Sequence, residues 1–171
     1  MQVRIVGTGQ MATDLSAVLS ERGVAVKATT DFSGALEPVT TLVWLPDPLE
    51  PVGDLVSDLV DLVDRSLAPA RIVMHGVVGT ADDAEPEQVG VWYHTDGKAL
   101  VMEHLYAVKM IDELEYPYVI VRTPPTSGSG GKIKPEGQPI TRSAVSRAAT
   151  VALLVAAVQE DAYVNQSVGL G

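Results

Sequence analysis

The sequence predicts a three-layer α/β fold, in which helices cover both faces of a doubly wound, mainly parallel sheet. Short apolar runs alternate with amphipathic helical segments, which is typical of parallel strands joined by helical crossovers. The runs are almost continuously apolar, as in strands buried on both faces, and a glycine turn separates the first run from the first helix. Because such crossovers are right-handed, we expect five or six strands in the order 2-1-3-4-5.

The N-terminal segment has the pattern of a strand–helix–strand unit. Residues 2–6 form an apolar run, and residues 7–12 form a glycine turn. The helix that follows carries apolar residues on one face and ends at Gly23. A second apolar run, residues 24–28, comes directly after it. This unit places the glycine turn at the carboxyl end of the first strand.

The segment after the second strand is unusually short. Residues 31–40 contain glycine and proline and are too few for another helix and strand, so we predict a connecting loop. Residues 41–46 form a third buried strand. Residues 47–67 have apolar positions at helical spacing, with prolines in the opening turns, where a missing N–H costs little. The fold is therefore expected to be shortened after the second strand.

The C-terminal half continues the alternation. We predict strands at residues 71–75 and 118–122, separated by a polar loop and a helix over residues 98–114. Residues 123–139 are rich in Pro, Gly and Ser and are predicted to form one long loop. Thr141 is the predicted N-cap of a last helix that runs to about residue 159.

Composition limits the possible functions. A chain of 171 residues is expected to form a single domain over residues 1–171. It has no Cys, and its three His residues show no ligand spacing, so we expect no metal site. A net charge of −10 without any basic cluster argues against nucleic acid as a partner. No apolar run is long enough to span a membrane and the N-terminus lacks a signal-peptide pattern, so we expect a cytoplasmic protein.

The turn at residues 7–12 has the pattern G-x-G-x-x-A between a strand and a helix. Gly7 allows the tight turn, Gly9 lets a pyrophosphate approach the backbone, and Ala12 keeps the helix close to the sheet. Thr8, Gln10 and Met11 complete this candidate cofactor-binding turn, because helix N-termini favour anions. The alternative interpretation is an ordinary glycine turn that binds nothing.

A dinucleotide site also needs a group that holds the ribose near the end of the second strand. Thr29 and Asp31 are the candidates, although Asp31 is equally compatible with a simple loop carboxylate. No Arg is placed to receive a 2′-phosphate, so the sequence leaves the choice between NAD and NADP open.

Several motifs, in this order and spacing, resemble one protein family over almost the whole chain. They are the turn at residues 7–12 and the segments 41–45, 72–76, 118–124, 140–145 and 163–169. Together they are similar to the NAD(P)-binding, NmrA-like atypical short-chain dehydrogenases/reductases. The resemblance implies a Rossmann-like fold with NAD or NADP across the carboxyl ends of the strands, beside Leu45, Pro46, His75 and Gly76. It also implies a substrate pocket formed by the loop after Arg122.

The sequence departs from that family at the expected catalytic residues. Where the family has a Ser at a strand end, this chain has His75 followed by glycine. The family's Tyr and Lys are four residues apart, whereas Tyr106 and Lys109 are three apart, and Tyr93 and Lys98 are five apart. We predict that Tyr106 and Lys109 do not act as a pair. His75 is then the candidate proton donor, with a purely structural histidine as the alternative.

Three functions are compatible with these patterns. The first is an NAD(P)-dependent oxidoreductase acting on a small molecule, and the second is a non-catalytic dinucleotide-binding sensor or regulator. The third is a scaffold that has lost nucleotide binding. The glycine turn favours the first two over the third, while the missing Ser and Tyr–Lys pair favour the second over the first. The sequence gives neither the substrate nor the oligomeric state.

Overall fold

The computed structural model describes all 171 residues and contains one seven-stranded sheet. Its strands are β1 (Gln2–Gly7), β2 (Ala25–Thr29), β3 (Thr40–Leu45), β4 (Arg71–Val77), β5 (Tyr118–Thr123), β6 (Ile133–Lys134) and β7 (Gln166–Leu170). They lie in the order β2-β1-β3-β4-β5-β7-β6, which confirms the predicted 2-1-3-4-5 arrangement of the first five. All neighbours pair in parallel except β6, which is antiparallel to β7.

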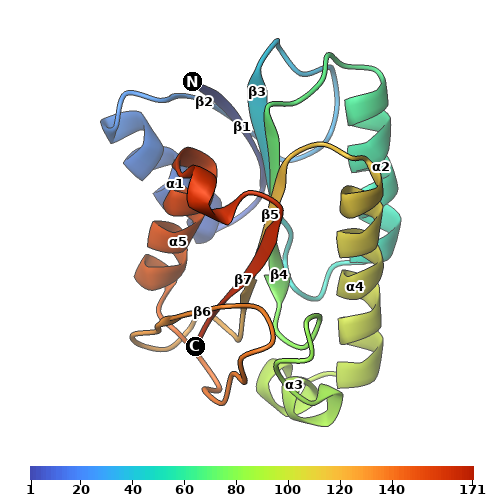
Figure 1. Cartoon of the computed structure of the whole chain (residues 1–171), viewed down its shortest axis with the longest axis vertical. Coiled ribbons are helices and arrows are strands. Elements are labelled where there is room, and N and C mark those ends of the chain that lie inside the picture. The colour runs from blue at the N-terminus through green and yellow to red at the C-terminus, as the bar shows by residue number, and fades with distance from the viewer.

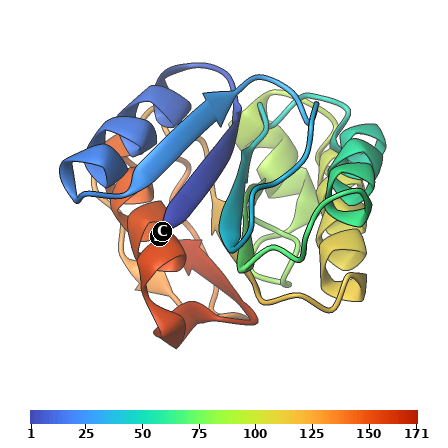
Figure 2. The ribbon, with the colours of Figure 1, turned by 90° about the horizontal axis from the view of Figure 1, so that it is seen from above.

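Two pairs of long helices cover the two faces of the sheet (Figures 1 and 2). The helices are α1 (Gln10–Glu21), α2 (Val52–Asp64), α3 (Pro86–Tyr93), α4 (Gly97–Glu113) and α5 (Arg147–Gln159). Apolar residues of α1 and α5 pack on one face, and those of α2 and α4 pack on the other. Every residue of β3 and β4 is buried, because both strands lie between the two helix layers. No helix is long and apolar enough to cross a membrane.

The expectation of five or six strands was wrong, because the sheet has seven. After α5 a short 3-10 turn, Asp161–Tyr163, leads into β7, which pairs with β5. The long loop after β5 also contains β6, whose two residues pair with the end of β7. Neither strand has an extended apolar run that periodicity alone detects.

The last helix begins later than predicted, because Thr141 is not its N-cap. The Ser146 side chain caps the helix by accepting a hydrogen bond from the Ala149 N–H at 3.0 Å. Residues before it remain extended because the Val145 N–H donates to the Pro125 carbonyl at 2.9 Å, and Ser127 forms a β-bridge with Ser146. Tertiary pairing with the loop after β5 therefore overrides the local helix signal.

Two other segments also differ from the prediction. The helix expected over residues 47–67 is α2, which begins only at Val52, because residues 47–51 form a turn in which the Asp47 carboxylate accepts from the Leu49 N–H. The polar loop expected after β4 contains α3, which starts with Pro86 at its first position. α3 packs against the start of α4.

Residues 31–39 form the predicted connecting loop, which contains no helix or strand. Two arginines fix its path through four consecutive backbone carbonyl groups. Arg4 Nη2 donates to the carbonyls of residues 31 and 33 at 3.0 and 2.7 Å. Arg65 donates to the carbonyls of residues 32 and 34. These hydrogen bonds, together with the buried side chains of Phe32 and Leu36, hold the loop against the rest of the fold.

Candidate functional site

The glycine turn lies between the end of β1 and the start of α1. A Cβ atom on Gly7 would come within 2.7 Å of the Leu45 carbonyl oxygen, so a side chain there would force β1 and β3 apart. Gly9 has φ +84° and ψ −170°, a backbone conformation that other residues rarely adopt. A Cβ atom on Gly9 would meet no atom within 4 Å, so the space above this residue is unobstructed.

The N-terminus of α1 opens onto this space. Gly9 is the N-cap residue, and no side chain accepts a hydrogen bond from the first turn of the helix. The first backbone N–H groups of a helix have no intrahelical acceptor, and the helix dipole gives this end a partial positive charge. The turn therefore offers unpaired donors and a favourable field to an anion.

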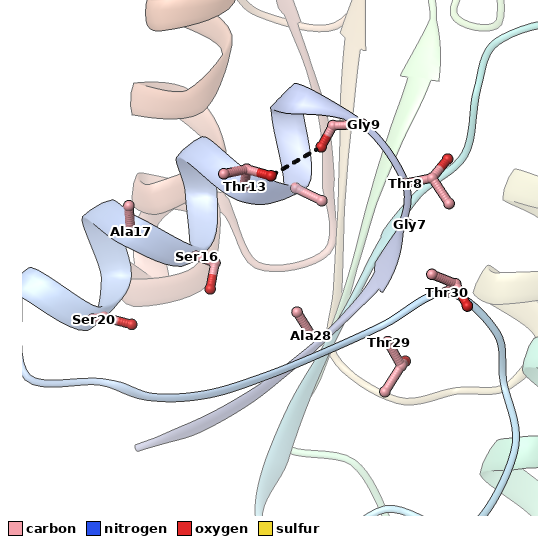
Figure 3. A pocket seen from close by; sticks show the side chains of 11 residues that line it. Gly7, Thr8, Gly9, Thr13, Ser16, Ala17, Ser20, Ala28, Thr29 and Thr30 are labelled. Carbon is pink, nitrogen blue, oxygen red and sulfur yellow. Dashed lines mark hydrogen bonds between the residues drawn. The ribbon is translucent and has the colours of Figure 1, made fainter.

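Two cavities meet at the glycine turn and share Thr8 and Gly9. The first, about 580 Å³, lies between α1 and the end of β2 (Figure 3). Its lining consists of small residues: Gly7, Thr8, Gly9, Ala12, Thr13, Ser16, Ala17, Ser20, Ala28, Thr29 and Thr30. The second, about 330 Å³, lies over the carboxyl ends of β3, β4 and β5. Its lining is Thr8, Gly9, Gln10, Met11, Leu45, Pro46, Asp47, Pro48, His75, Tyr93, Thr123, Pro125, Thr126 and Arg147.

The structure brings most of the predicted cofactor-binding residues together around these two cavities. Thr29 lines the first cavity, whereas Leu45, Pro46 and His75 line the second. Gly76 follows His75 within β4 and is buried beneath the second cavity rather than lining it.

Asp31 lies apart from both cavities. It lines a separate cavity of about 280 Å³ near the start of the 31–39 loop, together with Asp58, Asp61 and Arg65 among others. Its Oδ1 atom accepts hydrogen bonds from the Ser33 N–H at 3.0 Å and the Ser33 hydroxyl at 2.6 Å. These hydrogen bonds hold the pKa of Asp31 below its ordinary value. One carboxylate oxygen is thus already engaged in shaping the loop.

His75 lies near the carboxyl end of β4, with only 8% of the residue exposed. Its Nε2 atom is 2.9 Å from the hydroxyl oxygen of Thr123 on the neighbouring strand β5. Burial, together with the nearby His104, lowers the pKa of His75 to about 4. The ring is therefore neutral at pH 7 and offers one N–H donor and one lone pair.

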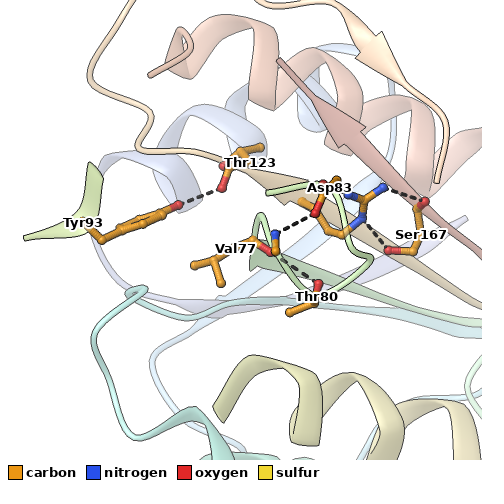
Figure 4. A network of polar contacts seen from close by, with 8 residues as sticks. Val77, Thr80, Asp83, Tyr93, Thr123 and Ser167 are labelled. Carbon is orange, nitrogen blue, oxygen red and sulfur yellow. Dashed lines mark hydrogen bonds and ion pairs between the residues drawn. The ribbon is translucent and has the colours of Figure 1, made fainter. Parts of the chain in front are cut away.

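Tyr93 at the end of α3 lines the same cavity. Its hydroxyl donates to the backbone carbonyl of Thr123 at 2.8 Å (Figure 4). Burial raises the pKa of Tyr93 well above its ordinary value. Lys98 is exposed in the first turn of α4, beyond the break that ends α3. Tyr106 is 50% exposed on α4 and lines neither cavity.

α4 holds the segment after β3 in place with two adjacent side chains. His104 Nε2 lies 3.0 Å from the Pro48 carbonyl oxygen, so this nitrogen carries the proton and donates. Glu103 accepts a hydrogen bond from the Gly53 N–H at 2.7 Å, near the start of α2. Pro48 lines the second cavity, so both contacts position part of its wall.

Sequence reasoning missed Thr123 and Arg147 of the second cavity, and it considered Tyr93 only for a pairing with Lys98. Thr123 follows the predicted strand 118–122 directly, so the rule that parallel strands place functional groups at their carboxyl ends could have identified it. Arg147 opens α5, and the later start of this helix brings its guanidinium beside the glycine turn. Its Nε atom donates to Asp14 on α1 at 2.7 Å. The place of Tyr93 in this cavity was not predicted, because α3 itself was not predicted.

A fully buried ion pair lies behind this edge of the sheet. The Arg122 guanidinium contacts the Asp83 carboxylate, and both side chains have no exposed surface. Arg122 also donates to the Ser167 hydroxyl on β7 at 2.7 Å, and Asp83 accepts from the Gly79 N–H at 2.7 Å (Figure 4). This network ties the loop after β4 to β5 and β7. No group of three or more His, Cys, Asp or Glu side chains is placed to hold a metal ion.

No model of a protein family and no curated protein matches the sequence. Solved structures match over nearly the whole chain. A short-chain dehydrogenase/reductase (wide type) from Veillonella parvula DSM 2008, in complex with NADP, has a TM-score of 0.72 at 16% identity, covering 99% of this chain and 94% of that one. The oxidoreductase ylbE from Lactococcus lactis has a TM-score of 0.73 at 14% identity, covering 99% and 90% of the two chains. This chain shares the Rossmann-like α/β fold of these structures.

A third match is the triphenylmethane reductase from Citrobacter sp., complexed with NADP(H). Its TM-score is 0.57 at 13% identity, and the match covers 98% of this chain but 68% of that one. At these identities the likeness is one of fold. It supports the Rossmann-like arrangement that the sequence motifs implied, with the glycine turn at the carboxyl end of β1.

Proposed function

We propose that the protein is an oxidoreductase that binds NAD or NADP across the carboxyl edge of its sheet and acts on a small molecule. One observation carries this proposal. The N-terminus of α1 has no side-chain cap, and it opens beside Gly9, where no atom blocks the approach and the two cavities meet. Structures with the same fold include one described in complex with NADP and one complexed with NADP(H). A dinucleotide has two nucleoside halves joined by a pyrophosphate, which suits two cavities joined at an anion site.

The residues around the glycine turn fit a pyrophosphate. The first N–H groups of α1 face the turn, and Arg147 lines the second cavity beside Thr8 and Gln10. Arg147 engages Asp14 through Nε, which leaves its terminal nitrogens as further donors for a phosphate. We place the ribose contact of the adenosine half at Thr30 rather than at Asp31, because Thr30 lines the first cavity. Thr29 lines it too, but its hydroxyl already accepts from Arg4 Nε and donates to the Asp31 carbonyl.

The second cavity suits the nicotinamide half and a substrate. A bound nicotinamide cofactor supplies the hydride chemistry. The chain's own residues supply the apolar wall of Leu45 and Pro46 and the polar groups of His75 and Tyr93. Since both polar side chains are neutral at pH 7, they can orient a neutral group such as a carbonyl rather than attract a charged one.

A non-catalytic dinucleotide-binding sensor is the second candidate. One observation favours it: the Tyr93 hydroxyl already donates to a backbone carbonyl, and burial raises its pKa. A tyrosine in that state is a poor proton donor at neutral pH. Cofactor binding is common to both candidates, so turnover distinguishes them.

Titration of the purified protein with NADH, NADPH and their oxidised forms tests the proposal. Binding is followed by the fluorescence of the reduced nicotinamide and by the melting temperature. At a cofactor concentration of one hundred times Kd, binding adds about 2.7 kcal/mol to stability. For a chain of this length that is a rise in Tm of about 5–11 °C. Absence of both the fluorescence change and the rise in Tm with all four nucleotides would refute the proposal.

A further inference from the structure

The buried hydroxyl of Thr123 has a single polar neighbour. Thr123 has no exposed surface, and its hydroxyl oxygen makes one hydrogen bond, the 2.9 Å contact with His75 Nε2. The backbone of Thr123 is fixed, because its carbonyl accepts from the Tyr93 hydroxyl at 2.8 Å and from the Val78 N–H at 3.1 Å. These backbone contacts therefore fix Thr123 where its hydroxyl contacts His75 Nε2.

This geometry selects one of the two neutral forms of the His75 ring. If Nε2 carried the proton and donated to Thr123, the hydroxyl proton of Thr123 would be buried without an acceptor. An unsatisfied buried donor costs about 1–3 kcal/mol. If Thr123 donates to Nε2 instead, its proton is satisfied, and the ring carries its own proton on Nδ1.

The other ring nitrogen, Nδ1, has no hydrogen-bond partner in the chain. This atom is also not fully buried. His75 itself lines the second cavity next to Leu45 and Pro46. An N–H at Nδ1 is therefore available to a molecule in that cavity.

We propose that Thr123 is a positioning residue that keeps the proton of His75 on Nδ1, so that the neutral ring donates a hydrogen bond to the carbonyl oxygen of a substrate. This inference rests on the proposed oxidoreductase function and specifies what the substrate site recognises. A neutral donor in a desolvated position prefers a neutral oxygen acceptor, because a charged partner would lose its hydration without an opposite charge to replace it. The substrate is therefore expected to present a neutral oxygen acceptor, such as the carbonyl oxygen of an aldehyde or ketone.

The protonation site is measured directly by long-range ¹H–¹⁵N NMR of the histidine rings at pH 7, which needs no substrate. The signals of His75 are assigned by their loss in His75→Gln. In the wild type we expect a protonated Nδ1 and an unprotonated Nε2. Thr123→Val should release this preference and give a mixture of the two forms, whereas Thr123→Ser keeps the hydroxyl and should retain the wild-type pattern.

The results separate this inference from the proposed function. A proton on Nε2 in the wild type overturns the inference, and so does an unchanged pattern in Thr123→Val. If Thr123→Val does not fold, the wild type and Thr123→Ser still decide, since a proton on Nε2 in either contradicts the assignment. Failure to bind any of the four nucleotides in the titration described above would instead overturn the proposed function and leave the ring measurement intact.

A kinetic measurement tests the role in turnover. NADPH oxidation is followed with a panel of small aldehydes and ketones. We expect Thr123→Val to lower kcat/KM at least tenfold and Thr123→Ser to restore it to within threefold of the wild type. Equal losses in both variants would contradict a role for the hydroxyl.

Discussion

Replacing Gly9 with valine tests the glycine turn through two separate quantities, stability and cofactor affinity. The Cβ atom of the new residue meets no atom within 4 Å, so the cost to folding comes from the backbone conformation alone. A residue other than glycine at φ +84° and ψ −170° costs about 1–3 kcal/mol. For a chain of this length, Tm should therefore fall by about 2–12 °C.

The loss of affinity has a different cause. The valine side chain fills the unobstructed space through which a phosphate would approach the N–H groups of α1. We expect NADPH affinity to fall at least a hundredfold, which is about 2.7 kcal/mol of binding free energy. Fluorescence titration at a temperature well below both melting transitions measures this loss on folded protein.

Gly137→Val is the matched control. Gly137 also has a positive φ, +82°, and a Cβ atom there would likewise meet nothing within 4 Å, but Gly137 lines neither cavity. It should lose stability without losing affinity. If Gly9→Val binds NADPH as tightly as the control does, the pyrophosphate does not lie over this turn, and the reasoning about the uncapped helix is refuted.

Three further predictions follow from the buried and exposed side chains. Asp83→Asn leaves the Arg122 charge buried without a counterion, so urea denaturation should give a loss of about 3–5 kcal/mol, and a loss below 1 kcal/mol would contradict this. The folded-state pKa of His75, about 4, lies below the ordinary 6.5. As the pH falls, His75 is therefore protonated in the unfolded chain before it is protonated in the folded protein. Stability should hold above pH 6.5 and fall by up to about 3 kcal/mol towards pH 4, and His75→Gln should flatten this dependence in denaturation curves. In the oxidoreductase assay, Tyr106→Phe should cost less than threefold in kcat/KM, roughly 0.6 kcal/mol, and His75→Ala tenfold or more, about 1.4 kcal/mol. A loss of several hundredfold in folded Tyr106→Phe would restore a mechanism based on that tyrosine.

The central strands were predictable because burial on both faces leaves a strong sequence pattern. The run at residues 41–46 became β3 and the run at residues 71–75 became β4, each within two residues of its ends. β7 was not predicted as a strand, because its residues 166–170 include glycine and polar side chains and do not form a continuous apolar run. Its existence depends on contacts with residues far away in the sequence.

The predictable parts of the candidate site are those whose sequence pattern lies within a single segment. The turn at residues 7–12 is local, and so is the placement of His75 at a strand end. Tyr93, Thr123 and Arg147 come from three different elements, and only the packing of α3 and the bridge beside Ser146 bring them to one cavity. No pattern within a single segment carries that information.

The arginine contacts of the 31–39 loop show that residues outside the loop help to determine its conformation. Within the loop, Arg4 and Arg65 bind main-chain oxygens of residues 31–34, which every amino acid possesses. Part of the loop's route is thus encoded in β1 and at the end of α2. The loop's own residues encode the rest, because Phe32 and Leu36 are buried in the core. An exposed position whose side chain makes no hydrogen bond, such as Glu37, can be replaced without redirecting the chain. Ser33 differs, because its hydroxyl donates to the Asp31 carboxylate at 2.6 Å. Replacing Arg4, which lies more than twenty residues earlier, would remove two of the hydrogen bonds that hold the start of the loop.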